Sequence, residues 1–169
     1  EVHGYAKQGA AYGYTGKRGL NIQVATISTP LTAPVIGRAR LRRGNTASAA
    51  GAGRLLAQSI TTARAAGVRG QIPNRADSAF YGHAFVGTAI RHKTWFSVTA
   101  RMDPKVKAAI ASIEDTAWQM IKYPNAIWED DDTAPDGGYW VSDAEVTEVP
   151  FVAFTGRRKA DHVKCPLVV

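Results

Sequence analysis

The chain has 169 residues, a formal net charge of +7 and a pI near 9.8. Its hydrophobic share of 45% and charged share of 21% are ordinary for a globular protein, and the length suits one full domain with its own core. No apolar run is long enough to span a membrane, no secretory signal is visible, and the lone Cys165 excludes an internal disulfide framework and fits a reducing cytosol.

The first half of the chain predicts a hairpin followed by a helix. After a glycine- and tyrosine-rich entry, residues 20–27 and 35–41 alternate in polarity or carry strand-forming side chains, and the segment between them holds two prolines. Residues 46–66 place apolar side chains at three- and four-residue steps, with Asn45 or Thr46 as the cap and Gly67 as the stop signal. These signals predict two paired strands and then a long helix.

The second half predicts shorter elements. Strands are expected at residues 68–76, 94–100, 139–142 and 146–154, and helices at residues 83–93, 103–113 and 115–121. Pro104 suits the first turn of its helix, with Asp103 as the cap. Antiparallel strands followed by strand–helix–strand units predict an α/β fold with a mixed sheet and helices on its faces.

Asp77 is the residue most suggestive of chemistry. It lies between the strand expected at 68–76 and the helix expected at 83–93, and the carboxyl end of such a strand is where α/β sheets bind ligands. A carboxylate there could hold a divalent ion, because hard cations prefer oxygen ligands. It could equally cap the next helix by accepting backbone N–H bonds. The pattern alone leaves both interpretations open.

Several segments together resemble a known family. One of these segments begins with Arg75-Ala76-Asp77-Ser78, and the others combine glycine, aromatic and basic residues. The segments are residues 2–4, 9–19, 41–46, 75–82, 96–103 and 154–162. In this order they resemble the group-one DDE transposase domain of bacterial insertion sequences, over nearly the whole chain.

The resemblance implies a ribonuclease-H-like fold in which three acidic residues bind two Mg²⁺ ions, with Mn²⁺ as a substitute. Asp77 matches the second acid, as metal ligand and catalytic residue. The first acid would precede Glu1 and the third would follow Val169, so we expect a fragment. Residues 1–102 would be a partial core that lacks the start of its first strand, and residues 103–169 a mostly-β insertion truncated at its C-terminus.

The surplus of positive charge favours polyanionic partners. The resemblance narrows the partner to the terminal inverted repeats of an insertion sequence, and implies a cytoplasmic, nucleoid-associated bacterial enzyme whose intact form could be a homo-oligomer. No membrane partner is expected. The candidate DNA-binding residues are basic side chains that cluster along the sequence. They are Lys17, Arg18, Arg42, Arg43, Arg101, Arg157, Arg158 and Lys159.

Two alternatives to a transposase stay open. A non-catalytic basic remnant would bind DNA without metal, and a ribonuclease-H-like nuclease would hydrolyse without joining. Relatives have an apolar stretch before the Asp77 segment, whereas this chain has Pro73 and Asn74, which predict a short or distorted strand. The acidic run at residues 129–136 lacks calcium-loop spacing and predicts a solvated turn, and the four histidines and Cys165 lack zinc spacing.

Overall fold

The computed structural model describes residues 2–3, 7–121, 127–130, 133, 135, 137–141 and 144–169. The chain divides into two compact units, Glu1–Arg101 and Met102–Val169. The division falls one residue before the boundary expected from the sequence. In the described residues no helix is long and apolar enough to cross a membrane.

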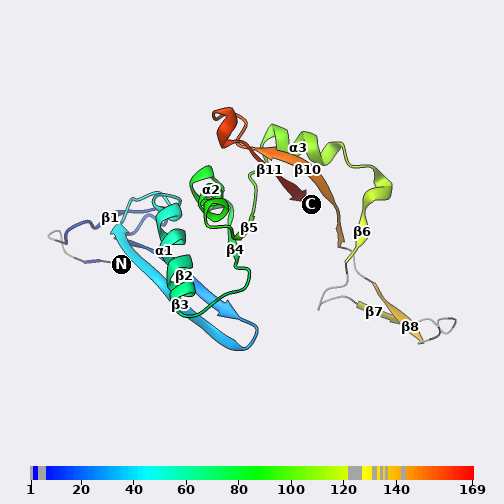
Figure 1. The fold of residues 1–169 in the computed structure, drawn as a ribbon, viewed down its shortest axis with the longest axis horizontal. Coiled ribbons are helices and arrows are strands. Elements are labelled where there is room, and N and C mark those ends of the chain that lie inside the picture. The colour runs from blue at the N-terminus through cyan, green and yellow to red at the C-terminus, as the bar shows by residue number, and fades with distance from the viewer. Residues whose placement is uncertain are drawn as a thin grey trace. The chain divides into compact units, whose positions relative to one another are not determined.

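The N-terminal unit begins with an antiparallel sheet in the order β1-β2-β3 (Figure 1). Its strands are β1 (Ala11–Tyr12), β2 (Arg18–Thr29) and β3 (Thr32–Arg43), so the two predicted strands are confirmed and extended at both ends. Ile22 lies opposite Leu41, and the register shifts between Ala25 and Thr26. Opposite this shift, Gly37 is the unpaired residue of a bulge.

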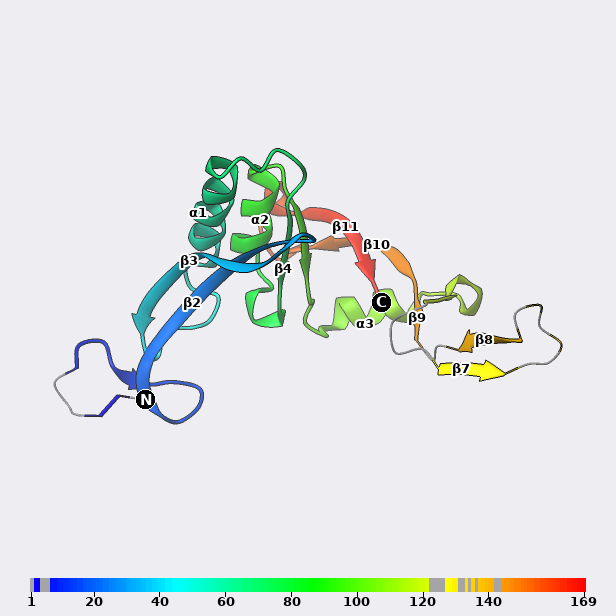
Figure 2. The ribbon, with the colours of Figure 1, turned by 90° about the horizontal axis from the view of Figure 1, so that it is seen from below.

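The two faces of the β2–β3 ribbon are unlike each other. Asn21, Gln23 and Ala25 form the less exposed side of β2, while Ile22 and Val24 are exposed. Helix α1 (Ala52–Ala65) contacts both strands, and Figure 2 shows α1 and α2 on the same side of the ribbon. Apolar alternation alone indicates the inward face wrongly here, because the apolar side chains of β2 point away from the helices.

Helix α1 starts six residues later than predicted. Residues 47–51 form turns, and Gly51 caps the helix with a positive φ of 76° and no side-chain bond. Neither Asn45 nor Thr46 is the cap. The C-terminal signal is confirmed, because the helix ends at Ala65 and Gly67 takes a φ of 97°, which glycine adopts without strain.

A strand–helix–strand unit completes the N-terminal unit. It consists of β4 (Pro73–Ala76), the 3₁₀ turn η1 (Ser78–Phe80), α2 (His83–Arg91) and β5 (Trp95–Val98), and the two strands are parallel. The short strand predicted around Pro73 is confirmed. Proline is tolerated because β4 pairs with β5 alone among the described strands, and the Asn74 amide donates to the Trp95 carbonyl oxygen at 2.7 Å and to Thr94 Oγ1 at 2.8 Å.

The core of this unit lies between α1 and α2, which run side by side in both views (Figures 1 and 2). Helix α1 buries Leu56 and Ile60, and α2 buries Val86 and Ala89, which are 1% and 0% exposed. The helices approach closely because Gly53 has no side chain: a Cβ there would overlap the carbonyl oxygen of Ala84.

The described residues of the C-terminal unit form one α-helix and three antiparallel strand pairs. Helix α3 (Pro104–Ala111) is capped by Asp103, whose Oδ1 accepts from the N–H groups of Lys105 and Val106 at 2.9 and 3.0 Å, as predicted. The pairs are β6 (Gln119–Met120) with β9 (Glu145–Val146), β7 (Ile127–Asp130) with β8 (Gly138–Val141), and β10 (Glu148–Ala153) with β11 (Val163–Val168). Two 3₁₀ turns, η2 (Asp115–Ala117) and η3 (Lys159–Asp161), complete it.

The helix expected at residues 115–121 is wrong, since η2 is a single turn and β6 follows it. The α/β class is confirmed. Within the described residues, however, the antiparallel strands β1–β3 and the parallel pair β4–β5 form separate sheets and not one mixed sheet.

Replacement of Gly53 by valine should force α1 and α2 apart. We expect Gly53→Val to destabilise the N-terminal unit by about 1–3 kcal/mol, because an overpacked contact against a backbone oxygen cannot relax by side-chain rotation. Thermal unfolding followed by circular dichroism measures the loss. Gly70→Val is the matched control, since a Cβ at Gly70 meets nothing within 4 Å; equal losses for the two variants would contradict this account of the helix contact.

Candidate nucleic-acid interface

Asp77 lies directly after β4 and caps η1. Its Oδ1 accepts a hydrogen bond of 2.8 Å from the N–H of Ala79, and the residue is exposed. Of the two interpretations left open by the sequence, the backbone cap is therefore the one seen directly. The bond occupies one carboxylate oxygen, and the role of Asp77 as a metal ligand stays a prediction.

The surroundings of Asp77 match the position expected for a ligand-binding edge. Strands β4 and β5 are parallel with Ala76 opposite Val98, so their carboxyl ends lie at the same edge, and the Thr99 N–H donates to the Ala76 carbonyl oxygen at 3.4 Å. Arg101 follows β5 by three residues and is exposed. In α/β sheets this edge is where ligands bind.

The residues that the structure describes do not by themselves fit a two-ion centre. They contain no group of three or more His, Cys, Asp or Glu side chains able to hold a metal ion. Asp77 contributes one carboxylate, and one of its oxygens already accepts a backbone N–H bond. Two Mg²⁺ ions need several oxygen ligands between them. Any such centre would require further carboxylates.

Three candidate DNA-binding residues gather at one end of the β1–β3 sheet. Arg18 pairs with Tyr12 of β1, Lys17 directly precedes it, and Arg43 lies opposite Leu20 at the end of β3. Lys17 and Arg43 are exposed. We call Lys17, Arg18 and Arg43 the hairpin-end cluster, because the pairing of β1, β2 and β3 brings these three residues to the same end of the sheet.

Arg42 has a different environment from its neighbour in sequence. Its Nη1 donates to the carbonyl oxygens of Ala47, Ser48 and Ala50 at 3.2, 3.3 and 2.7 Å, and its Nε and Nη2 donate to Asn21 Oδ1. Partial burial, followed by the nearby charge of Arg40, lowers the pKa of Arg42 from its ordinary value, though a guanidinium stays charged. Arg42 therefore organises the turn before α1.

Arg40 has a related role on the same strand face. Its Nη1 donates to the carbonyl oxygen of Gly51 at 3.3 Å, directly at the start of α1. Arg38, Arg40 and Arg42 alternate along β3 and so share one strand face, a pattern typical of a basic surface that follows phosphates. The structure instead commits Arg40 and Arg42 to backbone carbonyls, so this face stabilises the entry to the helix.

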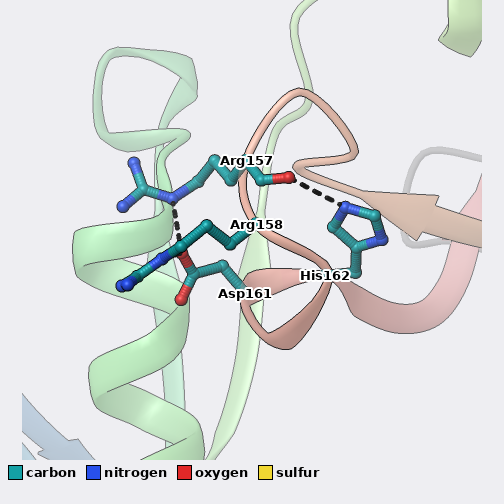
Figure 3. A network of polar contacts seen from close by, with 4 residues as sticks. All are labelled: Arg157, Arg158, Asp161 and His162. Atoms are coloured by element: carbon teal, nitrogen blue, oxygen red, sulfur yellow. Dashed lines mark hydrogen bonds and ion pairs between the residues drawn. The ribbon is translucent and has the colours of Figure 1, made fainter.

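The other basic cluster lies in the C-terminal unit, at the turn between β10 and β11 (Figure 3). Arg157 Nε and Arg158 Nε lie 3.5 and 3.7 Å from Asp161 Oδ2. Asp161 therefore pairs with both arginines of the cluster. His162 Nε2 lies 3.2 Å from the Arg157 carbonyl oxygen and must donate, because a carbonyl oxygen only accepts. Exposed ion pairs of this kind add little stability and leave the arginines accessible.

The charges of the chain are strongly divided between the two units. Residues 1–101 contain fourteen Lys or Arg and two acidic residues, which leaves a net charge of +12. Residues 102–169 contain the other seven Lys or Arg and twelve acidic residues, which leaves −5. Asp77 is thus the sole acidic residue of the N-terminal unit after Glu1. This division follows from counting residues in the sequence, and the total net charge of +7 conceals it.

Arg75 and Trp95 were not among the candidate residues. They alternate with inward-facing positions on β4 and β5 and are exposed, Trp95 by 68%. With the Gln71 amide oriented so that its oxygen faces the indole, Oε1 accepts from Trp95 Nε1 at 2.8 Å. Trp95 is therefore an oriented surface ring and not a core side chain. The surface position of Trp95 follows from the parallel register of β4 and β5, which the sequence does not predict.

The other residues considered from sequence do not form a site. Glu129 and Asp130 are exposed in β7, and Trp128 Nε1 donates to Asp130 Oδ1 at 2.9 Å. Asp131, Asp132 and Asp136 lie outside the described residues. Burial raises the pKa of the Cys165 thiol, which disfavours the thiolate that nucleophilic catalysis needs.

Comparison of the chain with family models, curated proteins and solved structures finds no significant match. The resemblance to DDE transposases therefore rests on the sequence segments quoted above.

The bonds of Arg42 predict a specific defect when its guanidinium is removed. We expect Arg42→Gln to lower stability by about 1–2 kcal/mol, since hydrogen bonds from a charged donor to three carbonyl groups are lost. Hydrogen exchange should accelerate at Ala50 and Ala52, whose amides bond within the 47–50 turns. Arg43→Gln removes the same charge from the exposed neighbour and should leave exchange unchanged; protection lost equally in both variants would contradict the assignment.

Proposed function

We propose that this chain is part of a DDE-type DNA transposase with a ribonuclease-H-like catalytic core, and that its N-terminal unit binds the DNA backbone. Three observations support the proposal: the resemblance of six sequence segments in order, the place of Asp77 at the carboxyl edge of a parallel strand pair, and the +12 charge of residues 1–101. The charge carries most weight, because each phosphate that a cation neutralises releases a counterion and so drives binding.

In this proposal different residues contribute to DNA binding and to metal binding. The hairpin-end cluster and Arg101 would contact phosphates, while Arg42 acts indirectly by fixing the turn before α1. Arg157, Arg158 and Lys159 would add contacts from the C-terminal unit. Asp77 would supply one carboxylate to a divalent ion that activates a hydroxyl and stabilises the phosphorus centre. The described residues alone would not hold the two ions, since they lack the remaining ligands.

The second candidate is a basic DNA-binding remnant without catalysis. The bond from the Ala79 N–H to Asp77 favours it, because a capping role explains this aspartate without any metal. A ribonuclease-H-like nuclease is the third candidate and shares the metal requirement of the transposase, so it differs only in whether the cut end is joined.

Duplex DNA should bind the chain through phosphates, with affinity falling steeply as salt rises. For a fluorescein-labelled duplex followed by anisotropy, replacing Lys17, Arg18 and Arg43 together with glutamine should weaken binding by about tenfold or more and make the salt dependence shallower. Replacing Lys105, Lys107 and Lys164, which removes three charges from the acidic unit, is the control and should change affinity less. No loss on removing the hairpin-end cluster would contradict its assignment.

Asparagine at position 77 separates capping from metal binding. Asn accepts the Ala79 N–H bond as aspartate does, so Asp77→Asn should change stability by no more than about 0.5 kcal/mol. In a longer polypeptide that supplies the other two acidic residues, the same change should abolish metal-dependent cleavage of DNA at the ends of the insertion sequence. Asp103→Asn, the same change at the α3 cap, should retain it.

The outcomes of that assay distinguish the three candidates. Full cleavage by the Asp77→Asn enzyme would overturn the metal-ligand assignment. Cleavage that requires Asp77 but never joins ends to target DNA would favour the nuclease. DNA binding that is indifferent to both metal and position 77, with no cleavage by the unmodified enzyme, would favour the remnant.

A further inference from the structure

Helices α1 and α2 together line a groove of about 400 Å³, which is within the size range of ligand sites. The two helices lie side by side in both views (Figures 1 and 2). Gly53 and Thr88 are among the less exposed residues of the groove, while Arg54 of α1 and Arg91 and His92 at the end of α2 are exposed. The groove, which we call the α1–α2 groove, therefore combines small, partly buried residues with basic side chains at its mouth.

A buried hydroxyl orients Arg91 at the α1–α2 groove. Thr88, which is 3% exposed, donates from Oγ1 to the Ala84 carbonyl oxygen at 2.7 Å and accepts from Arg91 Nη2 at 2.7 Å. A guanidinium has several N–H donors, so this bond orients the side chain and leaves other donors for a ligand. A cation held in this way loses less side-chain entropy when it binds an anion.

The positive charge around the groove has no acidic counterpart on either helix. Residues 2–76 and 78–101 contain no Asp or Glu, so the helices and the segments beside them cannot pair Arg54 or Arg91 with a carboxylate. Arg40 adds a third guanidinium, because its Nη1 donates at 3.3 Å to the carbonyl oxygen of Gly51, which also lines the groove. The groove is therefore a concentration of positive charge that an anion can neutralise.

Phosphate fits this arrangement better than a carboxylate or an apolar segment does. Guanidinium groups from two helices offer N–H donors in more than one direction, and a tetrahedral phosphate has acceptor oxygens in as many, whereas a carboxylate is planar. The glycine between the cations lets an anion approach the backbone at the start of α1. An apolar segment of the same polypeptide is not stabilised by covering charged side chains, since burial removes their contact with water.

We propose that the α1–α2 groove binds a phosphate group through the guanidinium groups of Arg54 and Arg91, with the His92 imidazole as a further donor. The phosphate site itself follows from the groove and its charges. The source of the phosphate rests on the proposed function: it belongs to the backbone of a DNA strand, which the N-terminal unit then contacts at a second place besides the hairpin-end cluster.

Titration of inorganic phosphate into the isotope-labelled whole chain, followed by the amide signals in NMR spectra, tests the site. The amide signals of Gly53 and Arg54 should shift and saturate, while sodium chloride at equal ionic strength and sodium acetate should shift them less. Arg54→Gln and Arg91→Gln should each weaken phosphate binding by about fivefold or more, because each removes a charged hydrogen-bond donor. Arg69→Gln is the matched control: it removes an exposed cation that does not line the groove and should leave phosphate binding unchanged.

A short DNA duplex then identifies the source of the phosphate. The duplex should shift the same amide signals, and Arg54→Gln should weaken its binding by about fivefold or more. Replacing the hairpin-end cluster with glutamine should weaken duplex binding as well, but should leave the response to inorganic phosphate unchanged.

The outcomes separate failure of this site from failure of the proposed function. No saturable shift with phosphate, or an equal response in Arg54→Gln, would overturn the phosphate site even where the duplex still binds. A response to phosphate without any duplex binding would overturn the action on DNA and assign the groove to a small phosphate compound. Tighter binding at these amides by a peptide with the sequence of residues 127–138 than by the duplex would overturn DNA as the occupant in favour of the chain's own acidic run.

Discussion

The close contact between α1 and α2 is the constraint on which the N-terminal unit depends. Neither of its sheets should be stable alone: β4–β5 has two strands, β1 adds only two residues to the β2–β3 ribbon, and an isolated two-stranded ribbon is marginal in water. α1 contacts β2 and β3, α2 contacts β5, and the two helices share a core around Ile60 and Val86. Gly53 permits this approach by leaving the Ala84 carbonyl unobstructed. Among the described strands, helix packing and not a common hydrogen-bond ladder therefore links the antiparallel sheet to the parallel pair.

Positive charge in this unit serves two separate purposes. Arg40 and Arg42 donate to the carbonyl oxygens of Gly51 and Ala50 and so fix the turn that precedes α1, while the helix itself starts at Gly51 without a side-chain cap. Lys17 and Arg43 remain exposed at the end of the same ribbon. Adjacent arginines in one strand thus differ in role because successive side chains of a strand point to opposite faces. A count of basic residues would treat them as equivalent.

Sequence patterns predicted the type and order of the principal elements, together with local devices such as the Asp103 cap and the Gly67 stop. They were wrong where contacts between residues distant in the sequence determine the local structure. The start of α1 depends on Arg42, which bonds carbonyls that would otherwise continue the helix towards its N-terminus. The inward face of β2 depends on Gln23 and its bond to Ser48. At Asp77 the pattern predicted the position, at the end of a parallel strand, but could not choose between a cap and a metal ligand.

The opposite charges of the two units have a practical consequence. If a protease cut the chain near Arg101, the N-terminal fragment would be strongly cationic at neutral pH and the C-terminal fragment moderately anionic. A cation-exchange resin would retain the first piece, and an anion-exchange resin would retain the second. Because the whole chain has an intermediate charge, its elution from either resin would report how far the acidic portion masks the basic one as ionic strength changes.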